Sequence, residues 1–429
     1  MEMISLYFFM FIFFIVIKVP IAFSLGITTT FMFYLTDIPV AAIPQRLFSG
    51  TSSFTLVAIP FFILAGELMS SGGILNRIFD FCRILVNRLK GGFYHINILV
   101  SMIFGGLNGS AVADTSACGS LLIKPTINEY KDPELVAALT AASSVVGPII
   151  PPSIPMLIYV FAAGNVSVSA MFAAGIVPGI MMGVGMMLVI WFVVRNKELP
   201  ANNEKLSLQQ KLLIFRRFLV AFALPVIMIG GIVSGIFTPT EAGCVAVLYA
   251  LFIGLFVTRE LTKNSIYAAF YRTVLISAMV LIMVSVAKVS TYWLTLNDVP
   301  YIIGGFMQSI TTNPLGFLIL LVIFYLIIGL FIEQAAAIIM LVPVFLPISV
   351  SYGIDPIHFG IVTIVSLALG LITPPVGLCV YISSGIAGAK VESVFKRILP
   401  FLGVQFFILI LLTLFPQIYL WVPKLLGLT

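Results

Sequence analysis

The chain has 429 residues, of which 61% are hydrophobic and 9% are charged, and its mean hydropathy is +1.19. A soluble domain carries about 25% charged residues, so this composition excludes an isolated soluble enzyme, a disordered protein and a nucleic-acid binder, despite the net charge of +6. A membrane-spanning helix needs about 20 apolar residues, which leaves room for about a dozen crossings. We therefore expect an all-α polytopic membrane protein.

An internal repeat is visible from spacing alone. The proline pairs Pro151-Pro152 and Pro374-Pro375 lie 223 residues apart, and each follows an Asp-Pro pair by nineteen residues and a glycine by four. A repeated order of this kind is typical of a duplicated chain. The sequence predicts two homologous halves, residues 1–195 and 218–429, joined by a polar connector over 196–217.

Lysine and arginine change sides between the two halves. Segment 77–90 carries four basic residues and its counterpart 300–313 carries none, whereas 390–397 carries three and its counterpart 167–174 carries none. Because basic residues concentrate on the cytoplasmic side, this exchange predicts an inverted-topology repeat. The connector is then cytoplasmic and the C-terminus periplasmic.

Four irregular segments interrupt the apolar runs, two in each half. Residues 105–115 are rich in glycine and small polar residues, and residues 329–337 contain one glycine, Glu333, Gln334 and three alanines. These two segments predict the tips of two re-entrant helical hairpins. Residues 147–153 and 370–377 contain glycine and proline, and they predict two broken helices. Irregular backbone is tolerated inside a membrane only where it is buried or lines a cavity. Such segments in corresponding positions of two halves point to the binding site of a transporter.

The chemistry of these segments favours a small cation. They contain no lysine or arginine, whereas the carboxylates Asp114 and Glu333 are present. Freed carbonyls, hydroxyls and a carboxylate are suitable oxygen ligands, and an anionic solute would be held by half-helix N-termini and bound cations. The pattern predicts a cation-coupled carrier for an organic acid. Structural alternatives stay open: Asp114 as a helix cap, Glu333 as a buried hydrogen-bond partner, and Glu67 and Lys288 as interface residues.

Residues 74–90 form an amphipathic pattern with apolar residues at helical spacing against three arginines. The pattern predicts an interfacial helix that lies on the membrane. If this helix has a role in transport, we expect it to brace a moving domain.

The chain resembles the large membrane subunit of the tripartite ATP-independent periplasmic (TRAP) transporters. The resemblance extends over nearly the whole length, in family order, at residues 59–69, 108–114, 147–153, 235–242 and 373–377. It implies an elevator-type carrier of the ion-transporter-like fold in a bacterial inner membrane, coupled to Na⁺ and without an organic cofactor. The implied scaffold comprises residues 1–91, 173–195, 218–313 and 390–429, and the implied transport parts comprise 92–172 and 314–389.

The resemblance also implies partners and a class of solute. The partners are a small four-helix membrane subunit and a periplasmic solute-binding protein, and the chain is surrounded by membrane lipid. The solute is a small organic acid, and sialic acids, sugar acids and C4-dicarboxylates are all compatible with the sequence.

By position in the family's motifs, the resemblance implies one sodium site between the first hairpin tip and the first helix break. It implies a second sodium site between the second tip and the second break. The expected sodium-binding residues are Asn108, Gly109, Ser110, Gly147, Pro151, Gly329, Glu333, Gly370, Thr373 and Pro374. The expected substrate-binding residues are Ser110, Thr115, Pro152, Ser153, Glu333, Gln334 and Pro375. Many relatives have aspartate where Glu333 stands, so contact with ion, solute or backbone stays open at that position.

Other functions fit the sequence less well. A stand-alone sodium/divalent-anion symporter of similar architecture would need no binding protein. An intramembrane protease would need H-E-x-x-H or paired aspartates with G-x-G-D, and neither pattern occurs. A passive channel would show flux only down the solute gradient. We expect a transporter subunit rather than an enzyme.

Overall fold

The computed structural model describes residues 2–52, 54–86, 89–199 and 207–428, and in these ranges all regular structure is helical. The first half contains α1 (Glu2–Val16), α2 (Ile21–Leu35), α3 (Ala42–Thr51), α4 (Phe54–Ser71), α5 (Ile74–Val86), α6 (Gly92–Asn108), α7 (Ala111–Tyr130), α8 (Pro133–Ser144), α9 (Ile154–Ala163) and α10 (Val168–Val194).

The second half repeats this order. It contains α11 (Leu208–Val233), α12 (Pro239–Phe252), the π-helix η1 (Ile253–Val257), α13 (Lys263–Leu296), α14 (Val299–Ile310), α15 (Pro314–Gly329), α16 (Gln334–Ser351), α17 (Pro356–Gly370), α18 (Leu378–Ala387), α19 (Val391–Leu414) and α20 (Gln417–Leu425). Helices α5–α10 correspond in order and length class to α14–α19, and the single helix α13 corresponds to the bent pair α3 and α4.

Helix lengths divide the chain into two kinds of segment. Six of the described helices are long and apolar enough to cross a membrane, or up to eight if each bent pair is one span. Several other apolar helices have only 10–17 residues. Such half-length helices are what hairpins and broken helices require, so the fold is the predicted all-α polytopic one with interrupted spans.

The repeated Asp-Pro pairs begin the two broken helices. Asp132 caps α8 and accepts a hydrogen bond from the amide of Leu135 at 3.2 Å. Asp355 caps α17 in the same way, at 2.7 Å from the amide of Ile357. The following proline takes the first helical position, where its missing N–H is not needed. These caps explain why the sequence repeats the Asp-Pro pair.

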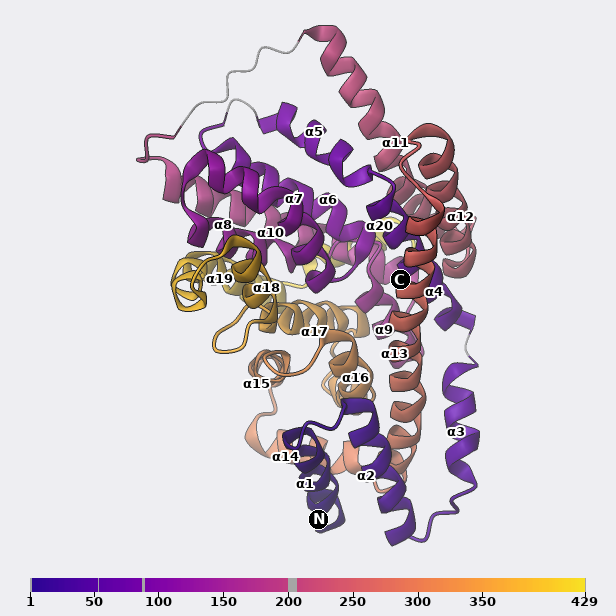
Figure 1. The fold of residues 1–429 in the computed structure, drawn as a ribbon. Coiled ribbons are helices and arrows are strands. Elements are labelled where there is room, and N and C mark those ends of the chain that lie inside the picture. Colours follow the sequence, from indigo (N-terminus) through magenta and orange to yellow (C-terminus); the bar gives the residue numbers. More distant parts are fainter. Residues whose placement is uncertain (1, 53, 87–88, 200–206, 429) are drawn as a thin grey trace.

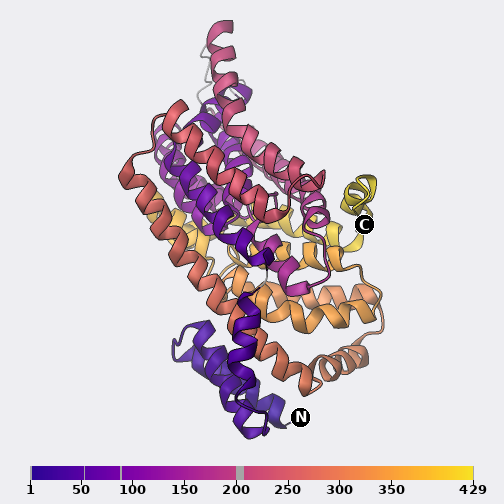
Figure 2. The ribbon, with the colours of Figure 1, turned by 90° about the vertical axis from the view of Figure 1, so that its right-hand side faces the viewer.

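The helices form an outer layer and an inner body. In the outer layer α4 packs on α12 and α13, and α13 runs along one side of the molecule in both views (Figures 1 and 2). The inner body, defined here as α6–α9 and α15–α18, holds both hairpins and both broken helices. Helices α10 and α19 pack against each other and against helices of the inner body. The predicted boundary between scaffold and transport part stays a prediction.

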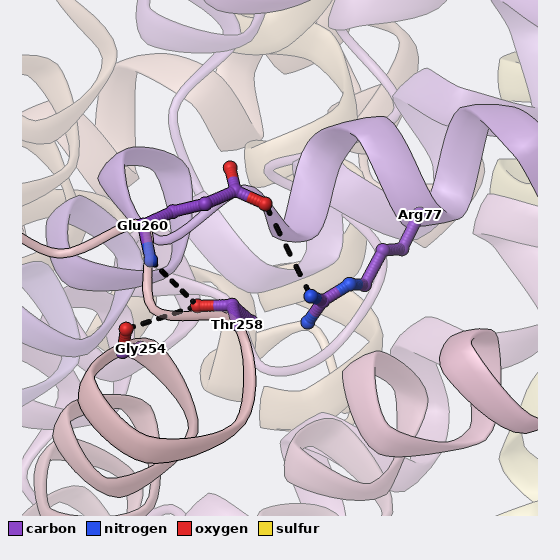
Figure 3. Close-up of polar contacts among 4 residues, drawn as sticks. All are labelled: Arg77, Gly254, Thr258 and Glu260. Atoms are coloured by element: carbon purple, nitrogen blue, oxygen red, sulfur yellow. Dashed lines mark hydrogen bonds and ion pairs between the residues drawn. The ribbon is translucent and has the colours of Figure 1, made fainter.

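Helix α5 is the predicted amphipathic helix, and it packs against α6 and α11 through a buried apolar face. On its other side Arg77 lies 4.0 Å from the carboxylate of Glu260 (Figure 3). Glu260 belongs to the turn after η1, which is held by a 3.3 Å bond from its amide to the hydroxyl of Thr258. The helix therefore joins the α12–α13 turn to the first hairpin.

Candidate functional site

The first hairpin turns where the sequence predicts it. Helix α6 ends at Asn108, Gly109 takes a left-handed backbone with φ of +66°, and Ser110 caps α7. A residue without Cβ is favoured at such a φ. The Ser110 hydroxyl accepts a hydrogen bond from the amide of Ala113 at 3.4 Å. The side chain of Asn108 lies outside the part of the structure that is described.

The first broken helix opens between Ser144 and Ile154. Ser153 caps the second segment: its hydroxyl accepts from the amide of Met156 at 3.3 Å and donates to the carbonyl of Pro148. Within the described residues, the carbonyl oxygens of Gly147, Ile150 and Pro151 accept no backbone hydrogen bond. The break thus presents oxygen atoms that the helix would otherwise have used.

The tip of the first hairpin lies directly against this break. A Cβ built on Gly105 would be 2.6 Å from the Cα of Gly147, which no side chain tolerates. A Cβ on the adjacent Gly106 would be 3.3 Å from the carbonyl oxygen of Pro151. Backbone therefore meets backbone, and the unpaired carbonyls of the break face the hairpin.

The second half repeats the contact with its own glycines. Helix α15 ends at Gly329 and α17 ends at Gly370, and a Cβ on Gly370 would be 2.5 Å from the carbonyl carbon of Gly329. In the described chain the carbonyls of Ile372 and Pro374 accept no hydrogen bond. The Thr373 hydroxyl beside them donates to the carbonyl of Leu369 at 2.7 Å. The second tip and break are therefore joined as the first pair is.

The two contacts bring helix C-termini together in pairs, α6 with α8 and α15 with α17. The C-terminal end of a helix carries partial negative charge, and unwound carbonyls there coordinate Na⁺ in transporters of this general kind. Free carbonyls, hydroxyls and the absence of lysine and arginine from the described tips and breaks make a hard-oxygen ligand set. The residues in both places therefore fit a small cation.

Glu333 bonds to backbone. Its carboxylate caps α16 and accepts from the amides of Ala335 at 3.0 Å and Ala336 at 3.2 Å, while the side chain stays exposed. The structure thus gives this residue a backbone contact, one of the three roles that the sequence left open.

The other predicted solute residues differ in accessibility. Pro152, Thr115, Ser153 and Gln334 are buried, whereas Ser110 is half-buried and Pro375 is exposed. The Thr115 hydroxyl donates within its own helix to Ala111 at 2.8 Å, and the Gln334 amide donates to the carbonyl of Ile364 at 2.9 Å. Only Ser110, Glu333 and Pro375 of this set present accessible surface in this conformation, and the solute assignment stays a prediction.

A buried polar cluster behind the first tip was not predicted. The Asn97 amide donates to Thr140 at 2.7 Å, and the Ser143 hydroxyl lies 3.1 Å from Asn97 Oδ1 and 3.0 Å from Ser101 Oγ. The i, i+4 spacing of Asn97 and Ser101 in an apolar run is the signal that could have indicated it.

Asp114 lies beside this cluster with no exposed surface. One carboxylate oxygen accepts from the Cys118 thiol at 3.1 Å, and the other has no partner among the described residues. Ser110 rather than Asp114 caps α7, so the cap alternative for Asp114 is wrong.

The two halves interlock, so the two tip-and-break pairs share one body. Helix α9 of the first half packs on α16, and α18 of the second half packs on α7 and α8 (Figure 1). The Tyr159 hydroxyl donates to the carbonyl of Pro356, and the Gln405 amide donates to the carbonyl of Ala142 at 2.9 Å.

Comparison with known proteins assigns the family. The family described as "Tripartite ATP-independent periplasmic transporter, DctM component" matches residues 8–418. The chain belongs to this family of TRAP transporter large permeases. It is 36% identical to the sialic acid TRAP transporter large permease SiaM of Vibrio cholerae, with 95% of each chain covered. It is also 36% identical to the 2,3-diketo-L-gulonate TRAP transporter large permease YiaN of Escherichia coli, with 94% and 95% covered.

A solved structure supports the architecture. The crystal structure of the YdaH transporter of Alcanivorax borkumensis matches 88% of this chain and 89% of its own, with a TM-score of 0.63 at 15% identity. At that identity the likeness shows the fold alone. The shared fold agrees with the all-α polytopic fold that the sequence predicted.

Proposed function

We propose that this TRAP large permease is the membrane-translocation subunit of a sodium-coupled importer of a small organic acid. The family assignment supports transport as its role and gives no enzyme activity. Sodium coupling, the solute and the elevator motion are the parts that we add.

The observation that carries the proposal is the repeated contact between hairpin and break. Gly105 on Gly147 and Gly329 on Gly370 put two helix C-termini and unpaired carbonyls together in each half. Such a ligand set favours a monovalent cation, because it supplies oxygen dipoles and little net charge. Glu333 and Ser110, at the mouths of the two tips, are the groups that we place nearest the solute.

The solute class follows from charge and from the relatives. Three relatives with the same sequence identity to this chain are named for three different acids: sialic acid, 2,3-diketo-L-gulonate and C4-dicarboxylate. An anion of this class would be held in the permease by the N-terminal end of α7 at Ser110 and by the bound cations. Each of these three relatives is 36% identical to this chain, so the proposal names the class that they share, a small organic acid.

We also propose the motion, orientation and partners. The inner body would carry solute and cations past the outer layer, with the connector 196–217 cytoplasmic and the C-terminus periplasmic, as the basic residues indicate. A small membrane subunit and a periplasmic binding protein would complete the complex. The family is described as tripartite, and the SiaT permease relative of Haemophilus influenzae is longer, with 66% of its length matched by this chain.

The test is reconstitution of this permease with its small subunit and binding protein in proteoliposomes. An inward sodium gradient should drive uptake of at least one of N-acetylneuraminate, succinate and gluconate above its equilibrium level, and a potassium gradient should not. Uptake that only equilibrates the solute would indicate a channel. Undiminished uptake without the binding protein would indicate the stand-alone symporter.

A further inference from the structure

A polar cavity lies at the boundary between the outer layer and the inner body, away from the hairpin tips. Its volume is about 500 Å³, and its lining includes Ser49, Phe161, Ser167, Ser169, Phe237 and Lys288. That volume falls within the range of about 300–1,000 Å³ that holds small-molecule ligands. One wall comes from α3, α13 and the α11–α12 turn, and the other comes from the end of α9 and the start of α10.

Lys288 supplies a positive charge without a negative partner. Its ammonium nitrogen lies 5.1 Å from the centre of the Phe161 ring, across the boundary. It makes no ion pair or hydrogen bond with any described residue, and no acidic residue lines the cavity. The Lys288 side chain is exposed and belongs to the candidate membrane span α13, where charged side chains are rare and pair with an opposite charge or mark a solute pathway. An anion in the cavity would complete this site.

The remaining polar groups of the cavity also favour an anion. Ser167 caps α10, and its hydroxyl lies 2.7 Å from that of Ser169, so the positive end of a 27-residue helix opens onto the cavity. Ser49 lines the cavity from α3, but its hydroxyl already donates to the carbonyl of Arg46 at 3.0 Å, and the Arg46 guanidinium stacks at 4.0 Å on the Tyr292 ring. The neighbouring α12 adds little positive potential, because the Glu241 carboxylate already caps it at 2.8 Å from the amide of Thr238.

The position of the cavity along the helices fixes its side of the membrane. It lies at the start of α10, whose other end leads into the basic connector, and toward the C-terminal end of α13, which begins at Lys263 shortly after Arg259. By the distribution of basic residues, it therefore opens toward the periplasm. A solute delivered from the periplasm would meet this charge before it reached the hairpin tips.

We propose that the Lys288 cavity is an entry site that binds a carboxylate group of the transported acid, with Lys288 as counter-ion and one hydroxyl of the Ser167–Ser169 pair as donor. The proposal rests on the proposed import of an organic acid. A phospholipid phosphate has the same anionic chemistry, and the experiment separates the two sources.

The first measurement is kinetic and uses the complete reconstituted complex. Lys288→Gln should raise the KM for the imported acid at least tenfold with little change in the maximal rate, and Lys288→Arg should restore most of the affinity. Lys263→Gln, on the same helix at the opposite end, is the matched control and should leave KM unchanged. Unchanged KM in Lys288→Gln would overturn the entry site while leaving sodium-driven uptake intact.

The second measurement does not depend on transport. An amine-reactive succinimidyl ester should label Lys288 at least fivefold more slowly in the presence of N-acetylneuraminate, succinate or gluconate than with uncharged glycerol, and Lys263 should react equally in all of them. Equal labelling of Lys288 with every acid would overturn the proposal. Protection that requires phosphatidylglycerol, and is absent in phosphatidylcholine alone, would assign the cavity to lipid and overturn it as well.

Discussion

The two tip-and-break pairs share their backbone and differ in their side chains. In both, a glycine at the end of the first hairpin helix touches a glycine at the end of a broken helix, at Gly105–Gly147 and Gly329–Gly370. The first pair then has a buried carboxylate, Asp114, behind the tip, whereas the second has an exposed carboxylate, Glu333, bonded to backbone at its mouth. The features that both halves share are therefore the free backbone carbonyls of the breaks and the close contact between the two glycines.

This difference separates two chemical tasks. Coupling ions are spherical, and the same backbone oxygens can hold one in each half of a duplicated chain. An organic acid is asymmetric and is bound once, so its recognition requires side chains that the repeat does not duplicate. We therefore expect equivalent glycine substitutions in the two halves to reduce uptake by similar factors. Substitutions of Ser110 or Glu333 should instead have effects that no equivalent residue of the other half reproduces.

The largest effect is expected from adding a methyl group to a shared glycine. Gly370→Ala would place a Cβ 2.5 Å from the backbone of Gly329, and Gly147→Ala would place one 2.8 Å from that of Gly105. The backbones must separate by about 1 Å, and a displacement of that size costs about a hundredfold in rate where geometry matters. Sodium-driven uptake should fall by about this factor in either variant.

Gly385→Ala is the matched control for these substitutions. Gly385 lies in α18 of the same inner body, and a Cβ there meets nothing within 4 Å. Alanine is favoured over glycine in a helix by roughly 0.5–1 kcal/mol, so this variant should keep its uptake and its Tm. If Gly147→Ala kept normal uptake while Gly370→Ala lost it, the two halves would not be equivalent.

The positions of these contacts could be predicted only in part from the sequence. The positions of glycine, proline and the Asp-Pro pairs predicted both tips and both breaks, because glycine permits unusual backbone angles and proline interrupts a helix. The partner of Gly147 could not be identified from the sequence, since Gly105 is one of 34 glycines and lies 42 residues earlier in the chain. The Asn97–Ser143 cluster and the Lys288 cavity depend likewise on tertiary packing.

A smaller effect, confined to the first half, is expected from Ser110→Ala. If sodium binds at the first tip, NaCl should raise the Tm of the permease above its value in KCl or choline chloride at equal ionic strength. Saturation at a hundred times the Kd corresponds to about 2.7 kcal/mol per site. Ser110→Ala should remove the part of this sodium-induced rise in Tm that comes from the first site and keep the part that comes from the second site. A full sodium shift in this variant would exclude Ser110 as a ligand.

Glu333 offers a test in which cap and charge can be separated. Glu333→Ala removes the hydrogen bonds to Ala335 and Ala336 and should cost about 1 kcal/mol, the usual value for a lost helix cap. Glu333→Asn retains a capping oxygen without the charge and should keep the Tm near that of the unsubstituted chain. Loss of uptake in Glu333→Asn would assign the carboxylate to transport, and full uptake would leave it a structural cap.

The smallest effect is expected where the repeat-related helices α5 and α14 differ at their surfaces. The described part of α5 is tied to the α12–α13 turn by Arg77 and Glu260 at 4.0 Å, whereas α14 contains no charged residue (Figure 3). The Glu260 side chain is 46% exposed, so solvent screens the pair, and such pairs contribute about 0.2–1 kcal/mol at most. Glu260→Gln should therefore change stability by about 0.5 kcal/mol or less, as measured by the Tm at low and high salt. An uptake rate reduced severalfold at unchanged Tm would instead show that this contact braces the outer layer during transport.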